Sequence, residues 1–192
     1  HGDNVGARGL WGKSNLYEES VAIPMILAGP GIPQGTSATP VSLLDLSATI
    51  AAQFGAPLDV AAGVTDLATL AAGPDDPNRP VFSEYHAAGA VSGAYMLRRG
   101  RWKYHHYVGF APELFDLQTD PEELSDRAAD PACAAILAEM EAALRDICDP
   151  DAVNARAFAD QADLIAGYGG RAAALNLGAP GATPPPATEQ AP

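Results

Sequence analysis

The side chains best suited to chemistry gather at the start of the chain. His1 and Asp3 flank a glycine, and Lys13 follows after further glycines. A histidine can bind a metal ion or carry a proton, a lysine presents a positive charge to an anion, and glycine lets the backbone approach a ligand closely. Polar residues and glycines that precede an apolar run, here residues 21–28, are typical of a loop at a binding site. From residue types alone, a solvent-exposed surface loop is the alternative.

A second candidate group is Glu84 with His86, at the end of a predicted strand. These side chains could line a substrate pocket, where the acid would favour a cationic substrate group, or form the solvent-facing side of an edge strand. His105 and His106 are adjacent on another, aromatic-rich strand, so their side chains point to opposite faces of a sheet. At most one of them can face a given site, and we expect both on the sheet surface or in the core.

The composition bounds the class of protein. The chain has 192 residues, 47% of them hydrophobic, and a net charge of −13, which suits one ordinary domain with a sizeable core. With only two lysines and no basic run, we expect neither nucleic acid nor an anionic membrane as a partner, because both need a basic surface. No stretch approaches the roughly 20 apolar residues of a membrane span. We therefore expect a soluble protein, with the compartment open between cytoplasm and periplasm.

The elements that must position these residues follow from the apolar spacing. Residues 1–20 are predicted as a loop and 21–28 as a buried strand. The spacing over 40–54 predicts a helix that ends at Gly55, and a short helix is expected around 67–72. Four runs rich in β-branched and aromatic residues then predict an antiparallel sheet. Those runs are 80–85, 93–98, 101–107 and 113–117.

The rest of the chain is predicted to be helical and then irregular. Asp120 and Asp130 each precede a proline and match the start of a helix. The second of them opens the best amphipathic pattern in the chain, which ends at Asp149. One further helix is expected over 152–166, and the proline- and alanine-rich end, 178–192, is predicted to be a flexible tail.

The order of these motifs resembles a known family. His-Gly-Asp at the start is followed by Trp-x-Lys ending at Lys13, by Tyr-Glu-Glu-Ser from Tyr17, and by Ile-Pro-Met-Ile-Leu-Ala-Gly-Pro-Gly from Ile23. This order is similar to a stretch of the sulfatase family, in the alkaline phosphatase superfamily, whose members carry Asp-His-Gly after a strand and a lysine about a dozen residues further on. The resemblance continues in the family's order to about residue 150. It includes Val41–Leu46, Ser83–His86, Arg101–Tyr104 and Leu114–Leu124.

The resemblance implies roles for individual residues. His1 would be the second half of an Asp-His pair that ligates a divalent metal ion, Ca²⁺ or Mn²⁺, with the aspartate lying upstream. Lys13 would contact the sulfate ester and stabilise the charge that builds up as the S–O bond breaks. Glu84 and His86 occupy a segment where choline sulfatase and its relatives place substrate-pocket residues. The polar residues around Lys13 would hold the loop: Asp3, Tyr17, Glu18 and Glu19.

One part of the family's machinery is not in this sequence. The family's nucleophile is a cysteine or serine in Cys/Ser-x-Pro-x-Arg, which is converted to formylglycine, and the chain contains no such motif. Cys133 and Cys148 lack that pattern, and their spacing resembles neither a disulfide framework nor a metal cluster. We therefore expect this chain to be the C-terminal portion of a longer enzyme that extends upstream of His1, and to be inactive alone.

The fold and function implied by the resemblance can be stated together. The fold class is α/β: residues 1–79 would form the C-terminal edge of an alkaline-phosphatase-like α/β/α sandwich, 80–150 a four-stranded antiparallel sheet with a long helix, and 151–192 an extension with the tail. The intact enzyme would hydrolyse a small-molecule sulfate ester. The alternatives are a phosphonate monoester or phosphodiester hydrolase of the same superfamily, or a non-catalytic packing or dimerisation module. A homo-oligomer stays open.

Overall fold

The computed structural model describes residues 2–56, 63–87 and 90–176. The chain divides into two compact units, residues 1–154 and 155–192. His1 and the predicted tail at 178–192 lie outside the described residues. No helix in the described part is long and apolar enough to cross a membrane.

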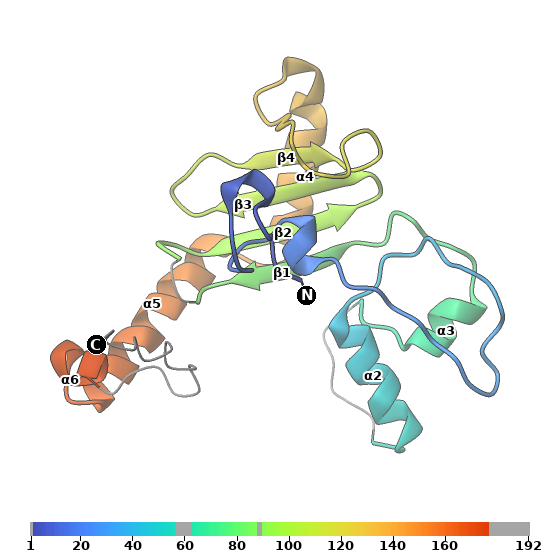
Figure 1. The fold of residues 1–192 in the computed structure, drawn as a ribbon, viewed down its shortest axis with the longest axis horizontal. Coiled ribbons are helices and arrows are strands. Elements are labelled where there is room, and N and C mark those ends of the chain that lie inside the picture. The colour runs from blue at the N-terminus through green and yellow to red at the C-terminus, as the bar shows by residue number, and fades with distance from the viewer. Residues whose placement is uncertain (1, 57–62, 88–89, 177–192) are drawn as a thin grey trace, which may run out of the picture. The chain divides into compact units, whose positions relative to one another are not determined.

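The centre of the first unit is an antiparallel sheet of four strands in the order β1-β2-β3-β4 (Figure 1). The strands are β1 (Val81–Tyr85), β2 (Ala94–Arg99), β3 (Trp102–Tyr107) and β4 (Glu113–Asp116). All four match the predicted runs to within one or two residues. Gly100, with φ of 62°, makes the tight turn that joins β2 to β3 and pairs Arg99 with Trp102.

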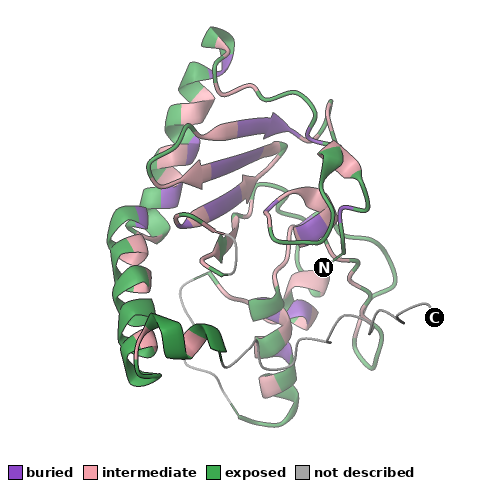
Figure 2. Ribbon diagram, turned by 60° about the vertical axis from the view of Figure 1, so that its left-hand side comes forward, coloured by how far each residue is buried: buried purple, intermediate pink, exposed green. Residues whose placement is uncertain are grey.

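The two faces of this sheet are covered by different parts of the chain. Figure 1 shows α4 (Ala134–Ile147), in orange, on one side and the N-terminal segment, in blue, on the other. The helix side forms the apolar core, visible as buried residues along the strands and helix in Figure 2. Core side chains come from alternate strand positions, from one stripe of α4 and from the residue just before it: Tyr95, Leu97, Tyr104, Leu114, Cys133, Met140 and Leu144.

The start of α4 confirms one predicted helix signal, whereas the other is wrong. The Asp130 carboxylate accepts the Ala132 N–H at 2.9 Å, and Pro131 opens a short 3-10 turn (Pro131–Cys133) that leads into α4. At Asp120 the carboxylate instead accepts the N–H groups of Leu124 and Ser125, at 3.0 and 2.8 Å, so the chain makes a loop there. An aspartate that accepts backbone N–H groups stabilises a turn as well as the start of a helix. A helix forms only where an apolar stripe follows that can be buried.

The predicted helices before the sheet are confirmed as α2 (Leu43–Gln53) and α3 (Leu67–Ala72). The fully buried Asp45 joins them to the segment just before β1. Its carboxylate accepts the Ser42 and Thr65 N–H groups, at 2.7 and 3.0 Å, and pairs with Arg79 at 2.6 Å. Burial alone would raise the pKa of Asp45, but the hydrogen bonds, led by that of Arg79, outweigh burial and hold the pKa below its usual value.

The predicted buried strand at 21–28 is wrong. Residues Glu18–Val21 form the short helix α1, and the following segment is not paired with a strand among the described residues. Its side chains still alternate, with Ile23 and Met25 half-buried and Ile26 90% exposed. The apolar period is therefore that of a strand, but a strand also needs a partner for its backbone hydrogen bonds.

Beyond α4, the expected helix at 152–166 is confirmed as α5 (Pro150–Gly167), which is followed by α6 (Arg171–Asn176). α5 begins in the first compact unit and continues into the second. Asn154 ties its first turns to the sheet, because its Oδ1 accepts the Gly93 N–H at 2.7 Å. Several large apolar side chains in these helices and in the turn between them are exposed: Phe158, Leu164, Tyr168 and Leu175.

The lowered pKa of Asp45 predicts how acid affects the stability of this chain. A carboxyl group whose pKa is lower in the folded than in the unfolded state stabilises the fold above its unfolded pKa of about 3.9, and this stabilisation is lost as the pH falls through the folded value. We expect Asp45→Asn to cost roughly 1.5–3 kcal/mol at pH 7. The difference from the wild type should shrink below about pH 4.

Urea unfolding of wild type and variant at pH 7, 5 and 3 measures this difference. Glu139→Gln is the matched control, because Glu139 also pairs with an arginine but its side chain is 56% exposed. A pH-independent loss for Asp45→Asn would contradict the prediction.

Candidate functional site

The loop that carries Lys13 is closed by its own backbone hydrogen bonds. The Gly2 N–H donates to the Glu19 carbonyl at 3.1 Å, and the Asn4 N–H donates to the Gly12 carbonyl at 2.8 Å. Gly2 must be glycine, because a Cβ there would lie 2.7 Å from the Glu19 oxygen. The loop between these contacts returns on itself, so that Lys13 comes back beside Asp3, with 4.0 Å between ammonium and carboxylate.

Lys13 and Glu84 line one cleft of about 730 Å³, although they are far apart in the sequence. Both side chains are accessible, 53% exposed for Lys13 and 44% for Glu84. The cleft walls are mainly apolar and come from the segment after α1, the start of α2, and strands β1 and β2. An apolar cleft with few charges can bind a small molecule and orient it by those charges.

The other predicted site residues lie differently. His86 Nε2 is 3.5 Å from Glu84 Oε2, and the His86 ring packs edge-on against Tyr95 rather than lining the cleft. His1 lies outside the described residues. Within the described residues, no three His, Cys, Asp or Glu side chains are grouped to hold a metal ion. The described part of this chain therefore does not form a metal site by itself.

Neither cysteine is among the residues that line the cleft. Cys133 is buried in the core beside α4, and Cys148 is half-buried. Burial raises the pKa of the Cys148 thiol, which disfavours the reactive thiolate.

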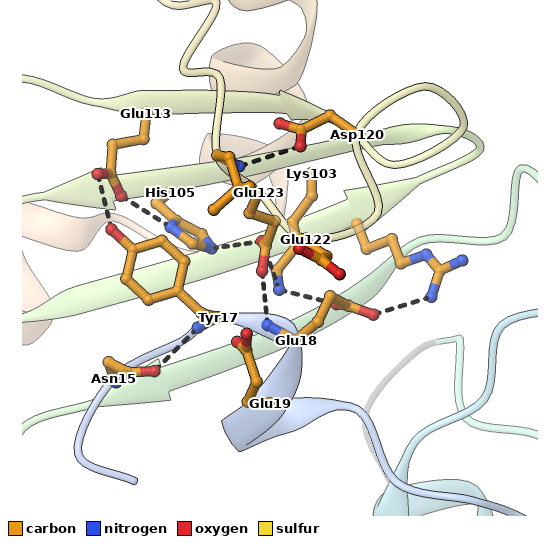
Figure 3. A network of polar contacts seen from close by, with 12 residues as sticks. Asn15, Tyr17, Glu18, Glu19, Lys103, His105, Glu113, Asp120, Glu122 and Glu123 are labelled. Carbon is orange, nitrogen blue, oxygen red and sulfur yellow. Dashed lines mark hydrogen bonds and ion pairs between the residues drawn. The ribbon is translucent and has the colours of Figure 1, made fainter. Parts of the chain in front are cut away.

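The face of the sheet under the N-terminal segment carries a buried network of polar side chains (Figure 3). The Lys103 ammonium is fully buried and lies 2.8 Å from both Glu18 Oε1 and Glu123 Oε1. The second oxygen of Glu123 accepts the Glu18 N–H at 2.6 Å. One cation is thus shared by two carboxylates from distant parts of the chain, and it joins α1 to the middle of the sheet.

Glu113 is the second bridge between this loop and the sheet. Its carboxylate accepts the phenol protons of Tyr17 and Tyr107, each at 2.9 Å, and lies 3.0 Å from His105 Nδ1. Burial alone would raise the pKa of Glu113, but these hydrogen bonds, with that of His105 first, hold it below its usual value. Burial, together with the Glu113 carboxylate, raises the pKa of both tyrosines, so they remain donors at neutral pH.

The two adjacent histidines lie on opposite faces of the sheet, as the strand geometry predicts. His105 is fully buried in the polar face, whereas His106 faces α4, where its Nδ1 lies 3.2 Å from Glu141 Oε2. Asp3, Tyr17, Glu18 and Glu19 were expected to hold the loop. Three of them make a contact that does so: Tyr17 with Glu113, Glu18 with Lys103, and Glu19 with Arg8. Asp3 only reaches Lys13 at 4.0 Å, and both side chains are exposed.

The roles of three residues in this region were not predicted from the sequence. Arg98 lines the cleft and lies 3.9 Å from Glu18 Oε2, and Lys103 and Glu123 form the buried pair. The alternation of side chains along the strands could have found two of them, because Arg98 and Lys103 are register partners and share a face of the sheet. The Glu123 contact carried no such signal, because it joins residues 105 positions apart through a loop.

Comparison with known proteins identifies the family. Residues 6–149 match the family described as N-sulphoglucosamine sulphohydrolase, C-terminal. The chain belongs to this C-terminal sulfatase family.

Individual relatives agree with this assignment. The chain is 41% identical over 134 residues to choline-sulfatase of Rhizobium meliloti (strain 1021), and 34% identical over 142 residues to arylsulfatase K of Mus musculus. Each match covers 68% of this chain and 26% of the relative. The solved structure of BT1596, a 2-O GAG sulfatase, is 32% identical with a TM-score of 0.66 and covers 77% of this chain and 34% of that one. The chain thus spans about a quarter of the length of these curated relatives.

The shared ammonium of Lys103 makes a prediction about stability. Lys103→Met should cost about 3–5 kcal/mol, because it leaves two carboxylates facing each other without their cation. Adding Glu123→Gln to this variant should recover part of the loss, since one of the two charges is then removed.

The matched control is Arg98→Met, which changes the register partner of Lys103 on β2. The Arg98 side chain is 39% exposed and lies 3.9 Å from Glu18, so this change should cost at most about 1 kcal/mol. Urea unfolding of all three variants measures these costs. Equal losses for Lys103→Met and Arg98→Met would show that burial of the ammonium has no special effect.

Proposed function

We propose that the protein to which this chain belongs hydrolyses a sulfate ester. The observation that carries the proposal is the meeting of Lys13 and Glu84 in one accessible cleft, in a chain of the C-terminal sulfatase family. The relatives named choline-sulfatase and arylsulfatase support the reaction class. The substrate would be a small molecule whose sulfate group reaches Lys13.

Lys13 would stabilise the transition state. As the S–O bond breaks, negative charge grows on the sulfuryl oxygens and on the leaving oxygen, and a fixed ammonium beside them lowers the barrier. One such contact contributes roughly 3–4 kcal/mol of transition-state stabilisation. The accessible ammonium of Lys13, held by its loop beside the cleft, suits this role.

Glu84 and His86 would act on the rest of the substrate. The Glu84 carboxylate lies in the same cleft as Lys13, so it would favour a substrate that carries a cationic group apart from its sulfate. His86, 3.5 Å from that carboxylate, would orient it. Glu84→Gln would then weaken the binding of cationic substrates more than the binding of neutral ones.

The remaining machinery would come from outside this chain. The sulfatase resemblance implies that His1 supplies one ligand to a Ca²⁺ or Mn²⁺ site, completed by residues elsewhere in the enzyme together with the formylglycine nucleophile.

The longer enzyme would also complete the fold. Residues 1–79 would form the C-terminal edge of an alkaline-phosphatase-like α/β/α sandwich, residues 80–150 the small sheet-and-helix subdomain, and 151–192 an extension. In support, the segment at 21–28 has the side-chain alternation of a strand, yet leaves Ile26 exposed. Other parts of the longer enzyme would cover this apolar surface.

Substitution of Lys13 tests the proposed function. In the full-length enzyme, Lys13→Ala should lower kcat/KM for an aryl sulfate by about two to three orders of magnitude. Its melting temperature should stay nearly unchanged, because substitutions of exposed residues usually alter stability by no more than about 0.5 kcal/mol. Lys13→Arg should rescue poorly, because the longer planar guanidinium does not reproduce a point ammonium.

Arg156→Ala is the control for loss of an exposed positive charge, since its side chain is 82% exposed on α5. Near-normal turnover by Lys13→Ala would remove the assignment. Assays of the wild type with aryl sulfates beside phosphonate monoesters and phosphodiesters identify the ester class, and preference for a phosphorus ester would replace the sulfatase proposal. No turnover of any of these esters would favour the packing or dimerisation module.

A further inference from the structure

A single short segment holds both ends of the stretch that carries Lys13. On one side of Lys13, the Arg8 guanidinium donates to the Glu122 carbonyl. On the other side, the Glu18 N–H donates to Glu123 Oε2 at 2.6 Å. Glu122 and Glu123 are adjacent, and Figure 3 shows both close to α1; the Glu123 carboxylate lies between Lys103 of the sheet and the Glu18 N–H of α1. The ends of the loop are therefore fixed to the same two residues.

Glu123 is held rigidly in this position. It is 2% exposed, and its φ of 53° places it in the left-handed region, which is costly for a residue with a side chain. Such a conformation persists only where the surroundings fix it. Here Lys103 lies 2.8 Å from Glu123 Oε1, and the Glu123 N–H donates to the Asp120 carbonyl at 3.2 Å.

Lys13 itself has little to fix it. Its ammonium is 4.0 Å from a carboxylate of Asp3 that is itself 54% exposed, so this ion pair contributes weakly. The backbone position of Lys13, and with it the part of the cleft that the ammonium can reach, is consequently set by the contacts on either side. A shift of about 1 Å in a catalytic group can cost about a hundredfold in rate.

We propose that Glu123 is a positioning residue for Lys13: by holding the start of α1 against the sheet, beside the Arg8–Glu122 contact, it sets where the Lys13 ammonium lies in the cleft. This inference rests on the proposed function of Lys13. It gives the loop that follows β4 a role in the reaction, although that loop is not part of the cleft lining.

A double-mutant cycle in the full-length enzyme tests the inference. With an aryl sulfate, Glu123→Ala should lower kcat about ten- to a hundredfold with a smaller change in KM. In the Lys13→Ala background the same substitution should change kcat less than about twofold, because the group it positions is already gone. Glu123→Gln, which keeps an oxygen to accept the Glu18 N–H, should retain more activity than Glu123→Ala and serves if the alanine variant does not fold.

Leu144→Ala is the control for a general loss of stability. Leu144 is fully buried in the core on the opposite face of the sheet. Any fold change in kcat that Leu144→Ala causes should therefore be the same in the wild type and in the Lys13→Ala background. Hydrogen exchange gives a second measurement without turnover. In Glu123→Ala, peptides covering residues 8–18 should exchange faster than in the wild type. In Leu144→Ala, exchange in these peptides should not increase more than exchange elsewhere in the chain.

The outcomes separate the two proposals. Suppose that Lys13→Ala lowers kcat and that Glu123→Ala lowers kcat by the same factor in the wild type and in the Lys13→Ala background. The positioning role is then overturned, and the function of Lys13 stands. If Lys13→Ala retains normal turnover, both fall together. Unchanged exchange over residues 8–18 in Glu123→Ala would also overturn the positioning role, whatever the kinetics.

Discussion

The buried ammonium of Lys103 is the interaction on which the arrangement of the cleft depends. A charge taken out of water needs close partners of opposite sign. Lys103 has two, Glu18 and Glu123, each with an oxygen 2.8 Å from its nitrogen. Those partners come from the helix after the Lys13 loop and from the loop after β4. Desolvation of one cation thus forces three separate parts of the chain to meet at a single point.

The same sheet serves two purposes because the side chains of its strands alternate. On β3, Tyr104 enters the apolar core against α4, while Lys103 and His105 face the N-terminal segment. The apolar face provides non-directional stabilisation through burial. The polar face provides direction, since each hydrogen bond requires a particular partner at a particular place. The apolar core thus stabilises the sheet, and the polar side chains on the other face determine where the loop with Lys13 lies on the sheet.

Local patterns were sufficient to predict much of this fold. The β-branched and aromatic runs predicted all four strands, and Asp130 with the apolar stripe after it predicted α4. Residues 21–28 show where such patterns stop, because periodicity describes a segment but not the neighbour that pairs with it. Asp120 shows the same limit, since its carboxylate caps a turn as readily as a helix. The motif around Lys13 was recognisable, but its support by Glu123 depends on long-range packing that no local signal records.

The distance in sequence between Glu18 and Glu123, 105 residues, also orders the folding of the molecule. The stretch with Lys13 precedes the sheet in the chain and therefore leaves the ribosome before it. Its docking surface does not exist until β3 and β4 have paired and the turn at Asp120 has closed, and contacts that join distant parts of a chain form slowly. Within this chain, a segment that is made before the sheet is consequently placed only after the sheet has formed.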